Sequence, residues 1–269
     1  MTSAAPPSIS TAASPDALPT GALIDLALLH SAAAEQGLEP CLTPAALAGF
    51  QTYAAALLEA NATLNLTRLC SPQELAVQQI LDSLICLRGL PEGHGPQTPL
   101  RLVDVGSGAG LPGLALRIAC PAWRLTLVES VAKKAAFLRA VAALPALQMA
   151  DTIVLAARAE DAARLPEHRA AYDLATARAV AALPVLAEYL LPFLRVGGRA
   201  LALKGAEAAE EARSAAGAIR KLGGELVELL PYRLPGLDQI RHLVVIEKRH
   251  PTAPAYPRRA GLPTARPLG

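Results

Sequence analysis

The stretch LVDVGSGAGLPG, residues 102–113, places four glycines within eight positions directly after a short apolar run. Two patterns overlap in it: G-x-G-x-x-G over 108–113 and D-x-G-x-G-x-G over 104–110. Both are typical of loops that hold a nucleotide-like ligand, because a backbone without Cβ atoms can turn sharply and approach the ligand closely. We therefore expect a nucleotide-type site at this loop, with the ligand decided by the surrounding residues.

Short apolar runs alternate with helical segments from residue 100 onward. The runs expected to form strands are 100–105, 124–129, 152–157, 172–178, 199–205, 224–234 and 242–248, with helices such as 130–144 and 183–194 between them. The fifth run follows an expected turn at Gly197-Gly198, and no helix separates the last two runs. This order predicts an α/β, Rossmann-like fold with a mostly parallel seven-stranded sheet and one antiparallel strand.

The chain divides by composition into four expected segments. Residues 1–19 are rich in Pro, Ala, Ser and Thr, which predicts a disordered extension. A helical region is expected over 20–95, with Thr43-Pro44 and Ser71-Pro72 beginning two helices and Glu74 completing a capping box. The ligand-binding domain is expected over 96–250, followed by a basic, proline-rich tail over 251–269.

Bulk composition narrows the class of protein. A hydrophobic content of 52% with 18% charged residues is typical of a globular chain, and no apolar run is long enough to span a membrane. The four scattered cysteines form no C-x-x-C pair, which predicts neither zinc nor disulfides and suits the cytoplasm. Residues 1–67 carry five acids and no Lys or Arg, whereas the remainder carries 25 basic and 18 acidic residues, or +7. Residues 249–269 carry Arg249, Arg258, Arg259 and Arg266 and no acid, which indicates a polyanionic partner.

Two acids distinguish between the candidate ligands. Glu129 ends the second expected strand, 19 residues beyond Gly110, where an acid can accept the ribose hydroxyls of an adenosine. Asp104 lies inside the first strand, where its charge would repel a pyrophosphate but favour a ligand with a sulfonium and an amino group. We therefore expect S-adenosylmethionine (SAM), with an NAD-dependent oxidoreductase as the alternative. Glu160, after the third strand, is expected near the adenine, or else is an acid of a first helical turn.

The segment after the fourth strand indicates the methyl acceptor. It reads ATARAVAALP, residues 175–184, and lacks the Asn/Asp-Pro-Pro-aromatic turn of amino-directed methylases; no cysteine follows Cys120 to act as a nucleophile. Guanine N7 needs no such machinery, because its lone pair attacks the methyl group and no proton leaves. Arg178 is expected to position either the SAM carboxylate or an RNA phosphate, and Lys204 has a similar expected role.

Eight motifs in order resemble one family. They are NATLNLT (61–67), ILDSL (80–84), VDVGSGAGLPG, ESVAKKAAFL (129–138), RAED, ARAV, ALKG and RHLVVIEK. The chain is similar, over about residues 43–268, to the bacterial small-subunit ribosomal RNA guanine-N7 methyltransferases, once called glucose-inhibited division protein B. The resemblance implies a SAM-dependent methyltransferase fold and N7 methylation of one guanine, at position 527 in the decoding-region loop of 16S rRNA, without a general base or covalent intermediate.

The cofactor contacts come from the loop and from the resemblance together. The expected SAM-binding residues are Asp104, Gly106, Gly108, Gly110, Leu111, Glu129, Ser130, Val131, Ala159, Glu160 and Arg178. Of these, Leu111, Ser130, Val131 and Ala159 rest on the resemblance alone. The chain departs from the family at Gln78-Gln79, where a basic pair ending in His is common, and at Ala60, where Trp is common.

Basic side chains are expected to contact RNA phosphates rather than to identify bases. The candidates are Lys133, Lys134, Arg139, Lys204, Arg258, Arg259 and Arg266. The expected partner is 16S rRNA or the small ribosomal subunit, and the expected state is a cytoplasmic monomer without a metal ion. A non-catalytic RNA-binding protein that retains a vestigial SAM fold is a second alternative.

Overall fold

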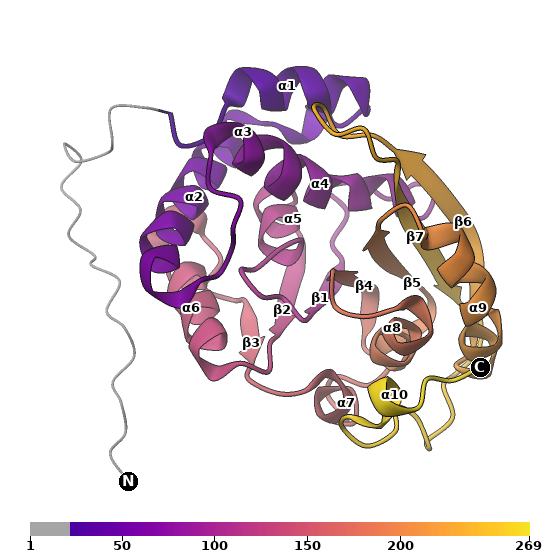
Figure 1. Ribbon diagram of the computed structural model, residues 1–269. Coiled ribbons are helices and arrows are strands. Elements are labelled where there is room, and N and C mark those ends of the chain that lie inside the picture. Colours follow the sequence, from indigo (N-terminus) through magenta and orange to yellow (C-terminus); the bar gives the residue numbers. More distant parts are fainter. Residues whose placement is uncertain (1–21) are drawn as a thin grey trace, which may run out of the picture.

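The computed structural model describes residues 22–269, so the extension expected over 1–19 lies outside the described residues. Its centre is one seven-stranded sheet in the order β3-β2-β1-β4-β5-β7-β6, with helices on both faces (Figure 1). The strands are β1 (Arg101–Val105), β2 (Arg124–Val128), β3 (Ile153–Leu155), β4 (Tyr172–Arg178), β5 (Leu194–Lys204), β6 (Gly224–Tyr232) and β7 (Arg241–Lys248). Only β7 runs antiparallel to its neighbours, so the predicted fold class is confirmed.

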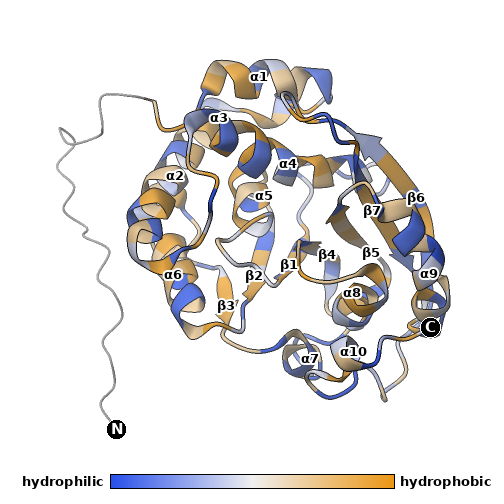
Figure 2. Ribbon diagram, viewed as in Figure 1, coloured by the Kyte–Doolittle hydropathy of each residue, from blue (hydrophilic) through white to orange (hydrophobic). Residues whose placement is uncertain are grey.

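Successive residues of each strand enter two different cores. In β1, Leu102 packs with one buried cluster, whereas Val103 and Val105 pack with the other. Figure 2 shows hydrophobic residues along the central strands, while helices such as α9 carry both hydrophobic and hydrophilic residues. Because helices cover both faces, both sides of the sheet are apolar, which explains why the strands are near-continuous hydrophobic runs in the sequence.

The helices form two layers. Their bounds are α1 (Leu26–Glu35), α2 (Pro44–Leu64), α3 (Pro72–Glu74), α4 (Asp82–Leu84), α5 (Gly113–Ala119), α6 (Ala132–Ala142), α7 (Ala159–Ala162), α8 (Leu183–Leu190), α9 (Ala208–Lys221) and α10 (Leu262–Ala265). The helices α1, α2 and α4 to α6 contribute to the first core, and α7 to α9 contribute to the second. The helical region expected over 20–95 therefore shares its core with the sheet, and a domain boundary at residue 95 stays a prediction.

Local capping begins two helices where the sequence predicts. The Thr43 side chain accepts a hydrogen bond from the Ala46 N–H at the start of α2. Ser71 and Glu74 form the complete capping box at the start of α3, and both predictions are confirmed. This second helical run continues through a π-helical segment, Leu75–Leu81, into α4 and a 3₁₀ turn, Ile85–Gly89. The π-helical segment brings polar side chains to the functional site.

The expected turn at Gly197-Gly198 is wrong. Strand β5 starts five residues earlier than predicted, at Leu194, and its register with β4 shifts between Tyr172 and Leu174. The two glycines therefore lie in an irregular part of the strand. Gly197 has φ +85°, and a Cβ on Gly198 would lie 2.8 Å from the Asp173 carbonyl oxygen. Glycine is required because β4 and this part of β5 approach so closely.

The segment after β7 is held against the sheet by a buried lysine. Lys248 Nζ donates to the Leu191 carbonyl at 2.8 Å and the Leu222 carbonyl at 2.9 Å, and also to the Thr252 hydroxyl. Burial, with a contribution from Arg169, lowers the pKa of Lys248 to about 7. Three acceptors thus satisfy an amine that has no carboxylate partner among the described residues.

Candidate functional site

The glycine loop leaves the carboxyl end of β1, where open α/β sheets bind their ligands. Gly106, Gly108 and Gly110 have φ values of +70°, +56° and +99°. A Cβ on Gly110 would lie 2.2 Å from the Leu114 side chain, and a Cβ on Gly106 would lie 2.7 Å from the Val180 side chain. Glycine is therefore required by both backbone conformation and close approach, as the sequence predicts.

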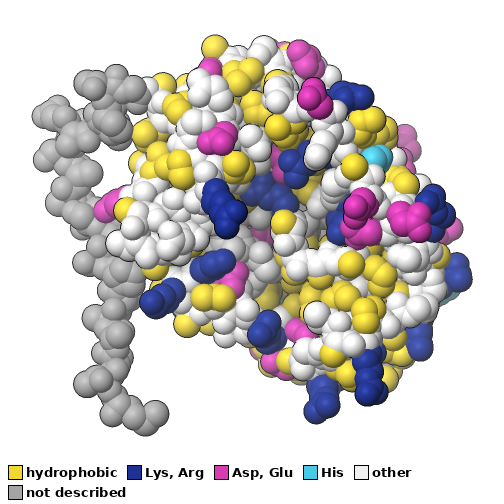
Figure 3. All heavy atoms as spheres, viewed as in Figure 1, with side chains coloured by type: hydrophobic (Ala, Val, Ile, Leu, Met, Phe, Trp, Pro, Cys, Tyr) yellow, Lys and Arg dark blue, Asp and Glu magenta, His cyan; other side chains and the backbone are white. Residues whose placement is uncertain are grey.

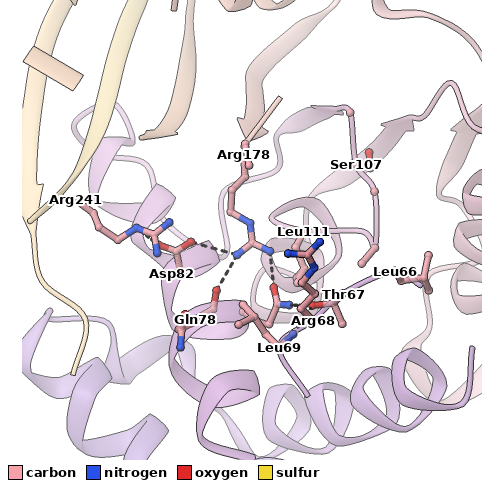
Figure 4. A pocket seen from close by; sticks show the side chains of 15 residues that line it. Leu66, Thr67, Arg68, Leu69, Gln78, Asp82, Ser107, Leu111, Arg178 and Arg241 are labelled. Atoms are coloured by element: carbon pink, nitrogen blue, oxygen red, sulfur yellow. Dashed lines mark hydrogen bonds and ion pairs between the residues drawn. The ribbon is translucent and has the colours of Figure 1, made fainter. Parts of the chain in front are cut away.

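Two cavities meet at this loop. The wide cavity has a volume of about 510 Å³, and the narrow cavity has a volume of about 70 Å³. The wide cavity is lined by Leu66, Thr67, Arg68, Leu69, Gln78, Gln79, Asp82, Gly106, Ser107, Gly108, Ala109, Leu111, Arg178, Ala179 and Arg241 (Figure 4). The narrow cavity is lined by Val105, Gly106, Val128, Ser130, Ala157, Arg158, Ala159, Glu160, Val180 and Tyr189. Gly106 lines both, so the two cavities lie on either side of this residue.

Glu129 fixes the loop to the end of β2. Its Oε2 accepts from the Gly108 N–H at 2.9 Å, and its Oε1 accepts from the Val131 N–H at 2.7 Å. The side chain is buried and lines neither cavity, but its partner Gly108 lines the wide cavity and the next residue, Ser130, lines the narrow one. An acid at this position can exchange a backbone donor for a ribose hydroxyl, which is the role that the sequence predicts for it.

Asp104 lies beneath the loop and lines neither cavity. Its Oδ1 accepts from the Thr176 hydroxyl at 2.9 Å, and its Oδ2 accepts from the Gly113 N–H at 3.2 Å. Burial raises the pKa of Asp104 to about 6, against the opposing effect of these hydrogen bonds. The structure thus shows Asp104 holding the start of α5 in place, and its effect on the charged groups of SAM, directly or through water, stays a prediction.

Tyr53 supports the loop from α2. Its hydroxyl donates to the Ala109 carbonyl at 2.9 Å, and the side chain is buried. Burial raises the pKa of Tyr53, so the phenol stays a donor. The N-terminal helices therefore contribute directly to the shape of the loop.

Arg178 extends from the end of β4 to the helical run of residues 72–89. Its Nη1 donates to the Gln78 carbonyl at 2.9 Å and to Asp82 Oδ2 at 3.2 Å, and its Nη2 donates to Gln79 Oε1 at 2.5 Å (Figure 4). Nε of Arg178 has no hydrogen-bond partner among residues 22–269. The guanidinium is thus fixed in orientation at the wall of the wide cavity and retains a donor for a ligand.

Asp82 is the buried acid of this wall. Besides Arg178, its Oδ1 accepts from the Tyr232 hydroxyl at 2.7 Å and lies 3.6 Å from Arg241 Nε. Burial and the neighbouring Asp82 charge raise the pKa of Tyr232. Asp82 belongs to the ILDSL motif of the sequence, and the structure shows that it holds two cavity-lining arginines.

Several lining residues were not among the predicted site residues. They are Leu66, Thr67, Arg68, Leu69, Gln78, Gln79 and Arg241. Leu66, Thr67 and Arg241 belong to the NATLNLT and RHLVVIEK motifs, which were used only for the resemblance, and Gln78-Gln79 was noted only as a departure from the family. Their contribution to the site depends on packing between distant segments, since Gln79 and its partner Arg178 are 99 residues apart.

The C-terminal segment contacts one residue that lines the narrow cavity, Glu160. Glu160 is buried, and its Oε1 accepts from the Gly261 N–H at 2.8 Å. Arg258, predicted to contact RNA, instead forms a bidentate ion pair with the fully buried Glu188, with Nη2 to Oε2 at 2.7 Å. Arg258 is therefore a structural anchor for residues 256–266. Burying Glu188 without such a partner would be costly, which explains the pairing.

The remaining basic candidates differ in whether their side chains form ion pairs or hydrogen bonds with other described residues. Lys204 forms an ion pair with Glu211 at 2.6 Å and donates to the Ala181 carbonyl at 2.9 Å, which gives it a structural role beside the loop after β4. Arg139 donates to the Val154 carbonyl. No ion pair is formed, within the described part of the chain, by Lys133, Lys134, Arg139, Arg259 or Arg266. Figure 3 shows Lys and Arg side chains around the central hollow and along the lower edge of this face.

Residues 22–269 contain no cluster of three or more His, Cys, Asp or Glu side chains suited to a metal ion. Among the same residues, no helix has both the length and the apolar character needed to cross a membrane.

Comparison with known proteins places the chain near one group. A family model described as rRNA small subunit methyltransferase G matches residues 46–242. Proteins named ribosomal RNA small subunit methyltransferase G from Roseiflexus sp. (strain RS-1) and Pelotomaculum thermopropionicum are each 48% identical over 219 residues, which are 81% of this chain and 90% and 89% of those proteins. Among solved structures, a predicted O-methyltransferase from Agrobacterium tumefaciens is 24% identical with a TM-score of 0.48, covering 64% of this chain and 80% of that one.

Proposed function

Because the chain belongs to the rRNA small subunit methyltransferase G family, a family of SAM-dependent enzymes, we propose that it methylates N7 of a single guanine in 16S rRNA of the small ribosomal subunit. The observation that carries this proposal is the crevice of two cavities that meet at Gly106, with Glu129 beside the junction and Arg178 on the far wall. The guanine corresponds, by the resemblance, to position 527.

The residues present fit SAM. Gly106 leaves room at the junction that a Cβ would fill, Glu129 can accept ribose hydroxyls, and Arg178 has a free Nε to meet a carboxylate. Ala159 and Glu160 line the narrow cavity, where the adenine would lie. We propose that Gly106, Gly108, Leu111, Glu129, Ser130, Val131, Ala159, Glu160 and Arg178 bind the cofactor, with Asp104 and Gly110 supporting the loop from below.

When bound, SAM supplies an electrophilic methyl group on a sulfonium. Within the described chain, Asp82 is the one acid that lines the wide cavity, and both of its oxygens already accept from Tyr232 and Arg178. The lining thus offers no free carboxylate as a general base, and attack by the N7 lone pair requires none. The contribution of the chain is to orient the acceptor and exclude water.

The loop after β4 lies where the two halves of the crevice meet. Ala179, with φ +55°, lines the wide cavity, and Val180 lines the narrow one. This conformation is uncommon for a residue with a Cβ and is held by neighbouring contacts such as the Lys204 bond to the Ala181 carbonyl. The loop therefore supports the proposed position of methyl transfer, beside Gly106.

We further propose that the protein acts as a cytoplasmic monomer, without a metal ion, on 16S rRNA or on the assembled small subunit. The exposed residues Lys133, Arg139, Arg259 and Arg266, with the half-buried Lys134, are available for phosphate contacts. Such contacts would position RNA without identifying its bases.

The test measures N7-methylguanosine in 16S rRNA from a strain that lacks the enzyme, by reduction and strand scission after incubation with SAM. The protein should modify one guanine, and Gly106→Val should reduce the rate at least about a hundredfold because the side chain fills the junction. Gly95→Val is the matched control, since a Cβ at Gly95 meets no atom within 4 Å.

Three outcomes would contradict the proposal. Binding of NAD in preference to SAM would indicate the oxidoreductase alternative, and SAM binding without methyl transfer would indicate the non-catalytic one. Modification at a site other than guanine N7 would overturn the proposed acceptor.

A further inference from the structure

The wide cavity has more positive charge than its cofactor can neutralise. Three arginines and one aspartate line it, Arg68, Arg178, Arg241 and Asp82, which leaves a formal charge of +2. SAM carries one carboxylate against an ammonium and a sulfonium, so its binding would add positive charge to this region. The compensating anion must therefore come from the other substrate.

Arg68 is the least constrained of the three arginines. Its side chain is exposed and makes no hydrogen bond or ion pair with any other described residue. The backbone that presents it is nevertheless firmly held. Asn61 exchanges two hydrogen bonds with Thr67, at 2.8 and 3.0 Å, and the Thr67 hydroxyl accepts from the Leu69 N–H at 3.0 Å. A fixed loop thus carries a free guanidinium at the cavity wall.

Arg241 is only partly satisfied. Its Nε is buried without a hydrogen-bond partner among the described residues, and the nearest carboxylate, Asp82, lies 3.6 Å away. Asp82 is already engaged by Tyr232 and by Arg178. The Arg241 side chain is 27% exposed and makes no hydrogen bond with any described residue, so its terminal nitrogens can meet an anion that enters the cavity.

The two arginines lie on opposite sides of Arg178. Figure 4 shows Arg241 extending from β7 on one side and Arg68, from the loop after α2, on the other. An acceptor base that enters the wide cavity carries a phosphate on each side of its sugar. Arginine forms charge-assisted, often bidentate hydrogen bonds with phosphate, which suits both positions.

We propose that Arg68 and Arg241 bind the two RNA phosphates that flank the target nucleotide, and thereby hold its base in the wide cavity. This inference rests on the proposed function, because it takes single-stranded RNA as the acceptor. Under this proposal, side chains at the cavity contribute to the affinity for RNA, in addition to any basic residues on the outer surface.

The test compares Arg68→Gln and Arg241→Gln with the control Arg220→Gln. Arg220 is exposed on α9 and lines neither cavity. Each cavity variant should raise KM for RNA about tenfold, with kcat and the Kd for SAM unchanged. The slope of log KM against log salt concentration should fall by about 0.7 to 1 per arginine, because each phosphate contact releases counterions. Arg68→Lys and Arg241→Lys keep the charge and should recover most of the affinity.

The outcomes separate the two proposals. If the unaltered protein methylates guanine N7 but the cavity variants match Arg220→Gln in KM and salt slope, this inference is wrong and the function stands. If the Kd for SAM rises instead, the arginines serve the cofactor, which also overturns it. If the unaltered protein does not methylate RNA at all, the proposed function itself fails.

Discussion

Asp104 illustrates how a single buried acid serves a loop that it does not line. Its carboxylate joins Thr176 of β4 to Gly113 of α5, so it connects the strand, the helix and the glycine loop. A Cβ on Gly113 would lie 2.8 Å from the Asp104 Cβ, which explains why the fourth glycine of the motif is needed. Part of the glycine motif therefore serves the packing of α5 against Asp104 beneath the site.

This environment predicts a pH-dependent contribution to stability. Burial raises the pKa of Asp104 from 3.8 to about 6, so the folded protein binds the proton more tightly than the unfolded chain. The contribution of Asp104 to the free energy of unfolding therefore falls as pH rises from about 4 to 7, by roughly 2 kcal/mol. Asp104→Asn removes this dependence.

Urea unfolding of both proteins between pH 4 and 7 measures the effect. The free energy of unfolding of Asp104→Asn, relative to the unaltered protein, should increase with pH. Parallel curves would show that Asp104 titrates alike in the folded and unfolded states and would contradict the prediction.

The residues of the site could be predicted only where they follow a local pattern. Gly106 and Glu129 lie at strand ends, and the chain itself fixes their spacing. The structural roles of Asp82 and Arg258 could not be predicted, because their partners Tyr232 and Glu188 lie 150 and 70 residues away. Contacts over such distances follow from tertiary packing, which has no local signature.

At the scale of elements, the π-helical segment Leu75–Leu81 is the part that couples the two walls of the wide cavity. Gln79 is buried within it, accepts from Arg178 through Oε1 and donates to the Thr67 hydroxyl at 2.7 Å through Nε2. One amide therefore joins the end of β4 to the loop after α2. Single π-helical turns are frequently found at functional sites.

Gln79→Leu should reduce kcat/KM for methyl transfer by about tenfold to a hundredfold, because Arg178 loses a buried acceptor and its fixed orientation. Gln79→Glu keeps an acceptor for Arg178 and can accept from the Thr67 hydroxyl, so it should recover most of the activity. Gln73→Leu, at an exposed position of α3, is the control.

Steady-state kinetics with thermal unfolding distinguishes positioning from stability. Equal losses in Gln79→Leu and Gln79→Glu, in proportion to their losses of melting temperature, would indicate a purely structural role and contradict this assignment.

Elements were more predictable than contacts. All seven strands lie at the predicted apolar runs; the central ones, such as β1, β2 and β4, are mainly hydrophobic because they are buried on both faces. The exception is the start of β5, where Gly197 and Gly198 suggested a turn. A pair of glycines is compatible with either a turn or an irregular strand. Here the strand continues because β4 lies close to Gly198 and leaves no room for a side chain there.

At the scale of the whole molecule, residues 256–266 connect the outer surface to a residue that lines the narrow cavity. Arg258 pairs with Glu188 of α8, Gly261 donates to Glu160 of α7, and the Tyr189 hydroxyl bonds with the Thr264 hydroxyl at 2.9 Å. The sequence predicted a basic tail for RNA. Its composition could not show that one of its arginines faces inward, since that depends on a buried acid elsewhere.

Arg258→Ala should destabilise the protein by about 3 to 5 kcal/mol, because Glu188 is left buried without a partner. The Kd for SAM should also rise, since Glu160 loses the neighbouring segment. Arg259→Ala, at the next and exposed position, should change stability by less than about 0.5 kcal/mol.

Calorimetry of both variants, with and without SAM, measures these effects. Adding Glu188→Ala to Arg258→Ala removes the unpaired charge and should recover part of the lost stability. A loss in Arg258→Ala no larger than that in Arg259→Ala would contradict the anchoring role.

The hydrogen bond between Gly261 and Glu160 makes one carboxylate common to two equilibria: detachment of the C-terminal segment and occupation of the narrow cavity. Thermodynamic reciprocity requires that each shift the other by the same factor. Any molecule that stabilises Glu160 in its present position must therefore make the outer segment detach less often. Occupation of the narrow cavity thus stabilises the C-terminal segment directly through Glu160, and no helix has to move for the two to be coupled.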